Sequence, residues 1–376
     1  QLLNSPMNFF KSIDPSADMV MMLVPDNITS VQYGNLKSVC DLRRGIVSQV
    51  VKKRNVELKN RNVLSNIALK INAKAGGINF CASISQSLKS LINKTIPYMV
   101  MGADVTHPLS GSMDETGASL ASVVSSLDPD ACRYTNQAIV NSRGRDVIDS
   151  MDAIIKISLS RYEQQNKQLP KRILMFRDGL SEGQFLEARA IELTDMQKGC
   201  AAYKKGYKPL LTFICVQKRH HTRFYPTVDP SKEFDCHPGL VVDDPRICEP
   251  DSYYLLSHKR IKGTAKAAHY KIIHDDSHFT TQQLVEFSFI LCHNYSRCSQ
   301  SVSLPTPTYY AHLCAFRSHF HRNFQEKVPV LVEAKKRMKC QALSNEEYLS
   351  AKKKYFEVLK ECITPHQQLT NSMYFV

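Results

Sequence analysis

The sequence predicts an α/β fold with a mixed central sheet that is flanked by helices. Three observations support this prediction: apolar runs of strand length, amphipathic helical stretches between them, and an apolar content of 43% over 376 residues. That length and composition suit a globular chain with two or three domains rather than a disordered one. A smaller α/β unit is expected to precede the main sheet.

This first α/β unit is predicted to end near residue 95, where the pattern of apolar residues changes. Strands are expected at residues 18–24 and 45–51, because both are apolar runs of strand length. Helices are expected at about 30–39 and 62–74, the second of which is followed by two glycines.

A second and larger unit is predicted from about residue 96 to the end. Its strands are expected at 98–103, 118–126, 133–140, 171–177, 210–216, 252–257 and 269–274. Its helices are expected at about 146–163, 181–198, 280–293 and 306–322. Residues from about 326 to 362 are rich in Lys and Glu, and they are expected to form a solvated, charged helical insertion.

The composition favours an intracellular protein with a polyanionic partner. A formal net charge of +14 and a pI near 9.2 favour nucleic acid as that partner. The 12 cysteines form no CxxC pair, which favours reduced, buried thiols over a disulfide scaffold or a zinc site. No apolar run reaches the length of a membrane span, and we expect no membrane partner. The first residues lack a Met and a signal-peptide layout, so we expect a fragment of a longer protein.

Two of the predicted strands end on a carboxylate. The run YMVMGADVTHP reaches Asp104, and the run KRILMFRDG reaches Asp178. Ligands gather at the carboxyl ends of strands in α/β sheets. Two converging carboxylates repel each other unless a cation lies between them, and hard oxygen ligands suit Mg²⁺ or Mn²⁺. The alternative is that each aspartate only caps a turn at the end of its strand.

His312 is a candidate third ligand of such a site. It lies in the apolar helical run TPTYYAHLCAFRSHFH, among small and aromatic neighbours. Aspartate and histidine together can hold two metal ions roughly 3.5–4 Å apart, an arrangement that hydrolyses phosphodiesters. The alternative is a histidine that is buried and hydrogen-bonded in the core.

Two pairs of residues in the first unit suit a phosphorylated nucleotide end. Tyr33 and Lys37 are four residues apart, as are Lys70 and Lys74, so each pair shares one helix face. A base can stack on the Tyr ring while the lysines neutralise a phosphate. Gln49 can add a hydrogen-bond donor. The alternative is that these are ordinary surface lysines.

A run of cationic side chains follows the strand predicted at 210–216. The run consists of Lys218, Arg219, His220, His221 and Arg223, and it is expected to be extended by Thr264 and Lys266. Contacts to phosphates position a nucleic acid without reading its sequence. The alternative is a basic loop that is simply solvated.

Several motifs resemble those of the Argonaute family, and of its Argonaute branch more than its Piwi branch. In family order they are GADVTHP (102–108), FRDGLSEGQF (176–185), VQKRHHTRFYP (216–226), SVSLPTPTYYAHLCAFR (301–317) and the final MYFV. The resemblance implies a partial, Rossmann-like MID domain at 1–95 and an RNase H-like PIWI domain at 96–376, with the insertion at 326–362. It also implies that the family's N and PAZ domains are absent.

The same resemblance implies a function in small-RNA-guided gene silencing. Members of the family bind the 5′-phosphorylated end of a guide RNA and pair the guide with a target RNA. Some members cut the target, and others silence through recruited partners, such as scaffold proteins of the silencing complex. An unguided nuclease is the third alternative, but such an enzyme needs no pocket for a 5′ end. The cytoplasm is the expected location, with the nucleus as the alternative.

The family's metal ligands are Asp, Glu, Asp and His, and this sequence matches three of them. Asp104, Asp178 and His312 stand at the positions that hold Mg²⁺ or Mn²⁺, whereas Asp146 replaces the glutamate. Aspartate is one methylene shorter, about 1.5 Å less in reach, and a misplacement of about 1 Å can cost about a hundredfold in rate. The resemblance therefore leaves open whether the chain is an endonuclease or a cleavage-incompetent effector.

A larger set of residues is assigned by the resemblance to the guide RNA. The positions that match the 5′-phosphate pocket are Tyr33, Lys37, Gln49, Lys70, Lys74, Arg297, Tyr309 and Arg317. The positions expected to contact the guide backbone are Lys218, Arg219, His221, Arg223, Thr264 and Lys266. Gln300 stands where many members carry Arg, which is expected to weaken one backbone contact without removing the pocket.

Overall fold

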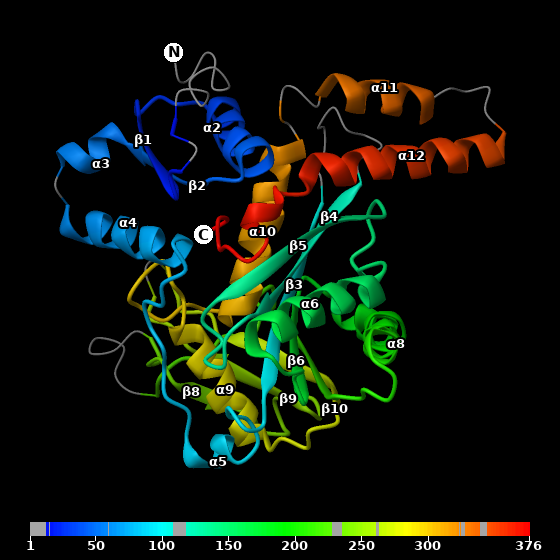
Figure 1. Ribbon diagram of the computed structural model, residues 1–376. Coiled ribbons are helices and arrows are strands. Elements are labelled where there is room, and N and C mark those ends of the chain that lie inside the picture. The colour runs from blue at the N-terminus through cyan, green and yellow to red at the C-terminus, as the bar shows by residue number, and fades with distance from the viewer. Residues whose placement is uncertain are drawn as a thin grey trace.

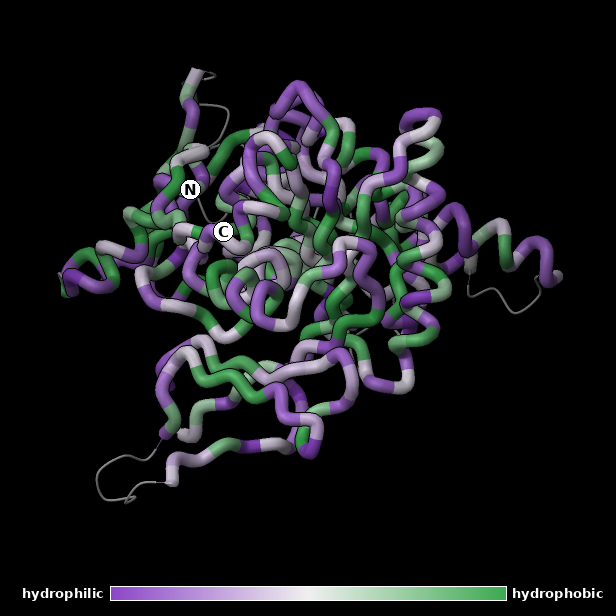
Figure 2. The backbone as a smooth tube through the Cα atoms, turned by 90° about the horizontal axis from the view of Figure 1, so that it is seen from below, coloured by the Kyte–Doolittle hydropathy of each residue, from purple (hydrophilic) through white to green (hydrophobic). Residues whose placement is uncertain are grey.

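The chain is described by a computed structural model that covers residues 13–14, 16–58, 60–107, 118–227, 235–260, 263–322, 324, 328–338 and 344–376. Two sheets organise this part of the chain (Figure 1). Figure 2 shows hydrophobic residues concentrated along the inner stretches of the backbone and hydrophilic residues common on the outer turns. Within the described residues, no helix combines the length and the hydropathy that crossing a membrane requires.

The smaller sheet lies in the first part of the chain and confirms the two strands predicted there. Its two parallel strands are β1 (Met19–Val24) and β2 (Val47–Lys52). The helices of this part are α2 (Ser30–Ser38), α3 (Lys53–Glu57), α4 (Arg61–Lys74) and α5 (Gln86–Lys89), with a π-helical turn at Val39–Arg44. Thr29 caps α2 with a reciprocal capping box to Gln32, which explains why that helix begins there.

The larger sheet has eight strands in the order β5-β4-β3-β6-β7-β10-β9-β8. The bounds are β3 (Tyr98–Thr106), β4 (Ser119–Ser126), β5 (Tyr134–Asn141), β6 (Arg172–Asp178), β7 (Leu210–Gln217), β8 (Leu240–Val242), β9 (Ser252–Leu256) and β10 (Ala268–Asp275). The central strands β3, β6 and β7 run parallel, and the outer strands pair antiparallel. This mixed sheet confirms the predicted fold class.

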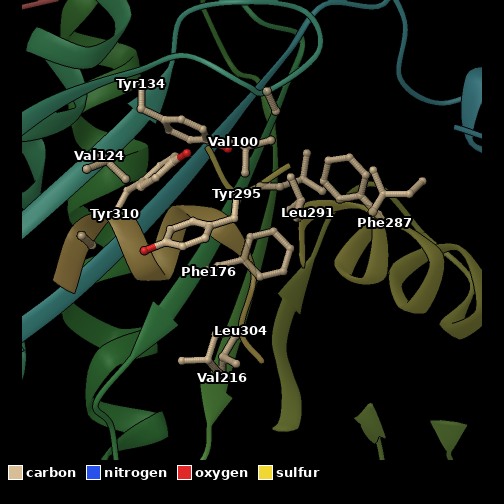
Figure 3. Packing of buried hydrophobic residues seen from close by; sticks show 14 of the residues in the cluster. Val100, Val124, Tyr134, Phe176, Val216, Phe287, Leu291, Tyr295, Leu304 and Tyr310 are labelled. Carbon is tan, nitrogen blue, oxygen red and sulfur yellow. The ribbon is translucent and has the colours of Figure 1, made fainter. Parts of the chain in front are cut away.

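Helices cover both faces of the larger sheet. One face is covered by α9 (Thr281–His293) and α10 (Thr306–Arg322), and the other by α6 (Met151–Asn166) and α8 (Thr194–Tyr203). A 3-10 turn (Glu182–Gln184), α7 (Phe185–Ala188) and a π-helical turn (Arg189–Leu193) lead into α8. Figure 3 shows Val100 and Phe176 of the sheet packed with the rings of Phe287 and Tyr310 on the α9 and α10 side.

The pleat of the central strands decides which side chains can form a site. Val100 of β3 and Phe176 of β6 face α9 and α10, whereas Met101 of β3 faces α6 and α8. Because successive side chains alternate between faces, Asp104 and Asp178 lie on the α10 side. Ala103 is in register with Arg177, so the two aspartates sit next to each other at the carboxyl ends of adjacent parallel strands.

Two helices after α10 form an arm at the edge of the sheet, α11 (Val328–Met338) and α12 (Asn345–Ile363), which lie side by side (Figure 1). Residues 326, 327 and 339–343 of the predicted insertion lie outside the described residues. The prediction of a solvated insertion is wrong for the inner face of α12. Tyr355 and Leu359 are buried there together with Leu120 of β4, because α12 is amphipathic.

The start of the helix predicted at 146–163 was also wrong. Helix α6 begins at Met151, and Ser150 before it has a φ of +62°, which interrupts helical geometry. Asp146 therefore lies in the loop between β5 and α6. The short strand β8 was not predicted, because three residues at a sheet edge give too little periodicity to detect.

Candidate functional site

The structure brings Asp104, Asp178 and His312 together at the carboxyl edge of the central strands. Asp104 is only 6% exposed, and its Oδ2 lies 2.9 Å from Nδ1 of His312 on α10. The His312 side chain is 57% exposed and faces a cavity of about 1890 Å³ that Asp104 and Asp178 also line. The three residues predicted as metal ligands therefore form one acidic centre.

Two carboxylates lie near each other in this centre, and their negative charges repel. Burial and the neighbouring Asp104 raise the pKa of Asp178 to about 6, although the Gly179 N–H donates to its Oδ1 at 2.7 Å. The hydrogen bond to Asp104 raises the pKa of His312. Like charges in a partly desolvated site favour a bound cation or a shared proton.

The donor set of the acidic centre fits a hard divalent cation in its chemistry, since it offers two carboxylates and an imidazole. In the part of the chain that the structure describes, however, no three His, Cys, Asp or Glu side chains are gathered closely enough to form a ready metal site. His312 directs Nδ1 to Asp104. The imidazole must give up that hydrogen bond before this nitrogen can act as a ligand.

Asp146 lines the same cavity, and both of its carboxylate oxygens have hydrogen-bond partners there. Its Oδ1 lies 2.7 Å from Nε2 of His107, and its Oδ2 accepts from Nε2 of Gln184 at 2.7 Å. The Nδ1 of His107 in turn lies 2.8 Å from the Ser119 hydroxyl. This chain of hydrogen bonds fixes where the aspartate points.

A buried ion pair supports the loops that carry these carboxylates. Arg177 and Glu192 are both fully buried and pair at 3.0 Å behind the acidic centre. Arg177 also donates to the backbone carbonyls of Asp178 and Asp146. One guanidinium thus connects the end of β6 to the loop before α6, which keeps the two aspartates at a fixed separation.

The cationic run after β7 forms part of the cavity wall. Lys218, Arg219 and His221 line it, and Lys218 donates to the hydroxyl of Ser303. Burial and the charge of Lys266 lower the pKa of Lys218, so these two cations lie near each other. Lys266 itself is outside the cavity lining, as is Thr264. The cationic run was predicted to form one continuous track with Thr264 and Lys266, but only part of this set lines the cavity.

Arg223 belongs to the part of this track that turns away. It donates to the backbone carbonyls of His220 and Thr222 at 3.0 and 2.7 Å, which directs its guanidinium into its own loop. It does not line the cavity. His220 lines it but points Nε2 at the carbonyl of Ala267, 2.8 Å away. Both side chains therefore hold the loop in shape.

A second cluster of cations lies between the first unit and helix α10. Lys37 of α2 and Lys74 of α4 both donate to the backbone carbonyl of Ser48, at 2.8 and 3.0 Å. Lys74 also donates to Oε1 of Gln49 at 2.8 Å, which places Gln49 within β2 at the centre of the cluster. Both lysines are buried, at 1% and 4% exposure, so helices far apart in sequence converge here.

The charges of this cluster are not balanced within it. Burial and the nearby Arg317 lower the pKa of Lys37 to about 7. Burial and Lys37 lower the pKa of Lys74, and burial and Arg297 lower that of Lys70. Cations that lower one another's pKa values in a desolvated place create a site at which a bound anion is favoured.

Arg317 of α10 reaches the cluster through a buried carboxylate. Its Nη1 donates to Oδ2 of Asp41 at 2.8 Å, and Nε2 of His321 lies 2.9 Å from the same oxygen. Although burial opposes it, Arg317 and His321 lower the pKa of Asp41 to about 2. Asp41 is thus a fixed anion that connects the first unit to α10.

The two predicted tyrosines take different places. Tyr33 lies beside the cluster, with the Lys37 Nζ 5.8 Å from its ring centroid and the Phe320 ring packed edge-on at 5.3 Å. Tyr309 lines the cavity at the acidic centre, and its hydroxyl pairs with that of Ser303 at 2.8 Å. Its ring also packs on that of Tyr295, with the ring centroids 5.3 Å apart.

Four residues of these sites were not identified from the sequence. His107 and Gln184 lie inside motifs that were recognised, yet nothing local indicates that they converge on a third residue. Ser48 contributes a backbone carbonyl, which no sequence pattern reveals. Asp41 follows Lys37 by four residues, and this helical spacing is a signal that would have drawn attention to it.

Comparison with known proteins supports one family. The Piwi domain model matches residues 19–323. Protein argonaute 18 of Oryza sativa subsp. japonica is 38% identical over 321 residues, covering 82% of this chain and 29% of that protein. Protein argonaute 5 of Arabidopsis thaliana is 35% identical over 330 residues, covering 82% of this chain and 32% of that protein. The chain thus spans about a third of the length of these relatives.

Solved structures agree with this result. The C-terminal lobe of a budding yeast Argonaute superposes with a TM-score of 0.83 at 25% identity, over 99% of this chain and 72% of that one. Kluyveromyces polysporus Argonaute, whose crystal structure includes a guide RNA, gives a TM-score of 0.82 at 25% identity, over 99% of this chain and 43% of that one. The family model, the sequence relatives and the solved structures agree, and the chain therefore belongs to the Argonaute family and carries its Piwi domain.

Proposed function

We propose that the chain binds the 5′-phosphorylated end of a small guide RNA and pairs the guide with a target RNA in gene silencing. The cluster of Lys37, Lys70, Lys74 and Arg317 carries this proposal. Burial and neighbouring cations lower the pKa values of Lys37 and Lys74, so positive charge in this buried cluster is favoured only when an anion joins it. A terminal phosphate is a dianion that would neutralise it, and the half-buried Tyr33 ring beside it offers a face for the first base.

Guide binding with and without a 5′-phosphate tests this proposal. We expect the phosphorylated RNA to bind about a hundredfold more tightly than its 5′-hydroxyl counterpart, because two or more charge-assisted hydrogen bonds are involved. Lys74→Met should remove roughly a tenfold part of that preference. Lys53→Met, a control at an exposed lysine that pairs with Glu57, should retain it. Equal affinity for both RNAs would contradict the proposal.

The proposal extends to hydrolysis of the paired target strand at the acidic centre. Asp104, Asp178 and His312 would hold Mg²⁺ or Mn²⁺, which would stabilise the charge that develops at the phosphodiester. Asp146 is oriented by His107 and Gln184, and each of its oxygens keeps a further lone pair for the hydrogen bond of an attacking water. The cationic residues of the cavity wall would hold the nucleic-acid backbone across this centre.

The alternative is an effector that binds guide RNA without cutting and silences through recruited partners. One observation favours it: Asp146 has both oxygens engaged at the cavity wall, and its side chain is one methylene shorter than that of glutamate. We also propose that the chain acts in the cytoplasm or in the nucleus, wherever its target RNA is located.

Cleavage of a matched target in Mg²⁺ separates these two functions. For the endonuclease we expect slow, site-specific cuts opposite the middle of the guide, and Asp178→Ala should abolish the cuts while leaving guide affinity unchanged. Asp146→Glu should accelerate cleavage roughly tenfold or more, because reach limits the reaction. If neither the natural chain nor Asp146→Glu cuts the target, the non-cleaving effector is correct.

A further inference from the structure

His319 of α10 is a histidine at the cavity wall that has no part in the chemistry proposed above. It lines the cavity together with Thr106, the last residue of β3. Its Nε2 lies 3.0 Å from the Thr106 hydroxyl oxygen, and that oxygen lies 3.1 Å from the backbone carbonyl oxygen of Leu120 on β4. Three groups on three elements thus form one short chain of hydrogen bonds, close in sequence to Asp104.

The direction of this chain follows from what each group can donate. A carbonyl oxygen only accepts, and a threonine hydroxyl has a single proton, which it donates to Leu120. Thr106 can therefore only accept from His319, which requires the ring proton to be on Nε2. Burial lowers the pKa of His319, so the ring is mostly neutral at pH 7. Its other nitrogen, Nδ1, is then a hydrogen-bond acceptor.

The Nδ1 atom of His319 is accessible to a ligand. Among the residues that the structure describes it has no hydrogen-bond partner, and it is not one of the fully buried side-chain atoms that lack a partner. This half-buried ring therefore presents its acceptor to the cavity that it lines. Water can satisfy the nitrogen in the free protein, but a strand that displaces this water must supply a donor in its place.

The chemistry of a paired strand limits which group can be that donor. An ionised phosphate has only acceptors, and the Watson–Crick edges of the target bases are occupied by pairing with the guide. The 2′-hydroxyls stay available, because an A-form helix displays them in its wide and shallow minor groove. A 2′-hydroxyl can donate a hydrogen bond, and DNA has no equivalent group.

The position of His319 on α10 limits which nucleotide it can reach. His319 follows His312 by seven residues, which is about 10 Å along the helix axis. Successive nucleotides of one strand rise by about 3.4 Å. A target strand with a phosphate at the acidic centre would thus bring a 2′-hydroxyl to His319 within about three nucleotides of that phosphate.

We propose that His319 accepts a hydrogen bond through Nδ1 from a 2′-hydroxyl of the target strand, within about three nucleotides of the phosphate at the acidic centre. The inference rests on the proposed function, since a target strand must occupy the cavity. It deepens that function by assigning to His319 the recognition of RNA over DNA at one position. Thr106 holds the ring in the tautomer that can accept.

Target strands that carry a 2′-fluoro group at one nucleotide at a time test the inference in the guide-loaded chain. Fluorine removes the donor but keeps the A-form shape of the sugar, so a loss of affinity reports the hydrogen bond. Divalent cations are left out, which keeps the strand intact. One position within about three nucleotides of the expected cut should then bind about fivefold more weakly. In His319→Phe, unmodified RNA should bind about fivefold more weakly, and 2′-fluoro at that position should add no further loss.

A matched variant and a second measurement control this experiment. His293→Phe changes another half-buried histidine, at the end of α9 and outside the cavity lining, and should keep the fivefold response. NMR of the free chain with ¹⁵N-labelled histidine reports the tautomer directly. The ring signals that disappear in His319→Phe should show a proton on Nε2 and none on Nδ1. Thr106→Val should weaken that preference and the response to 2′-fluoro together.

The outcomes separate this inference from the proposed function. If no position responds to 2′-fluoro, or if His319→Phe responds as the natural chain does, the hydrogen bond is refuted while guide binding stands. If Nδ1 carries the proton in the free chain, the inference is wrong whatever the target does. If a loss appears only when inosine, which lacks the minor-groove amino group, replaces a target guanine, a base is the donor and the assignment to ribose is wrong. Equal affinity for 5′-hydroxyl and 5′-phosphorylated guides contradicts the proposed function instead, and the NMR spectrum still decides the tautomer.

Discussion

Gly102 determines how closely helix α10 approaches strand β3. A Cβ atom at this position would lie 2.2 Å from both the carbonyl carbon and the carbonyl oxygen of Pro307. Backbone atoms cannot rotate out of the way, so a side chain would push α10 off the sheet. His312 follows Pro307 on the same helix, and the distance between His312 and Asp104 therefore depends on this glycine.

Gly102→Ala should consequently lower the free energy of unfolding by about 2–3 kcal/mol, the usual cost of overpacking a core. Gly183→Ala is the matched control, because its Cβ would meet nothing within 4 Å. That variant should change the free energy of unfolding by less than about 1 kcal/mol. Urea unfolding of both variants measures the difference, and equal midpoints would show that α10 is not limited by contact at Gly102.

The depressed pKa of Lys37 predicts that phosphate binding takes up a proton. With a pKa of about 7 instead of the ordinary 10.5, Lys37 is mostly neutral at pH 8 in the free protein. A bound dianion favours the charged form and raises this pKa, so protonation accompanies binding and affinity falls as the pH rises from 7 to 9. The phosphate itself contributes little, because its second pKa is about 6.

Calorimetry in two buffers with different ionisation enthalpies measures this uptake at pH 8. We expect up to about one proton per guide from Lys37, loss of that contribution in Lys37→Met, and no change in Lys53→Met. Identical apparent enthalpies in both buffers would mean that Lys37 is already charged in the free protein.

Residue-level prediction succeeded where the signal was local. Asp104 and Asp178 each follow an apolar run directly, and strand pleating alone brings them to one face. The surroundings of Asp146 were out of reach, because His107 and Gln184 lie 39 and 38 residues away from it in the chain. Contacts of that separation depend on the order of strands in the sheet, which no single segment specifies.

Helix α10 connects the parts of the molecule. It packs against β3, β4 and β5 of the larger sheet, against α2 of the first unit and against α12 of the arm. Its residues reach two sites, since His312 faces the acidic centre and Arg317 the cation cluster. A five-residue step along one helix thus sets the spacing of the two sites.

The buried carboxylate of Asp41 should be the strongest single attachment of α10 to the first unit. Asp41→Ala leaves Arg317 and His321 buried without their anion, which should lower the free energy of unfolding by about 3–5 kcal/mol. Asp244→Ala breaks an exposed pair with Arg246 and should leave the free energy of unfolding nearly unchanged. Chemical denaturation compares the two, and a small effect of Asp41→Ala would show that packing alone joins the elements.

Element-level prediction was good for strands and helices with clear periodicity and poor where tertiary contacts decide. The strands β3 to β7 and the helices α9 and α10 were predicted within a few residues. The burial of one face of α12 was missed, because a helix rich in Lys and Glu gives no sign of the partner that covers its apolar stripe. Packing against β4 and β5 supplies that partner.

At the scale of the whole molecule, charge and architecture point to the same ligand. The chain carries a formal net charge of +14, and cations gather at two places that the fold connects through α10. The domain boundary near residue 95 stays a prediction, since the two sheets fall on either side of it but nothing tests the division itself. A guide whose 5′ end binds at the cation cluster, and which pairs with its target at the acidic centre, would run along the cavity.

Binding of single-stranded guide RNA should therefore depend steeply on salt, since phosphate contacts release counterions. Each cation that contacts a phosphate contributes about −0.7 to the slope of log affinity against log salt. Arg219→Ala removes an exposed guanidinium of the cavity and should reduce the slope by about 0.7. Lys198→Ala, on the opposite face of the sheet and paired with Asp195, should leave it unchanged. Titrations between 50 and 300 mM KCl, roughly a sixfold range, resolve such a difference. Equal slopes for the natural chain and Arg219→Ala would place the guide backbone outside the cavity, and the path from the cation cluster to the acidic centre would have to be redrawn.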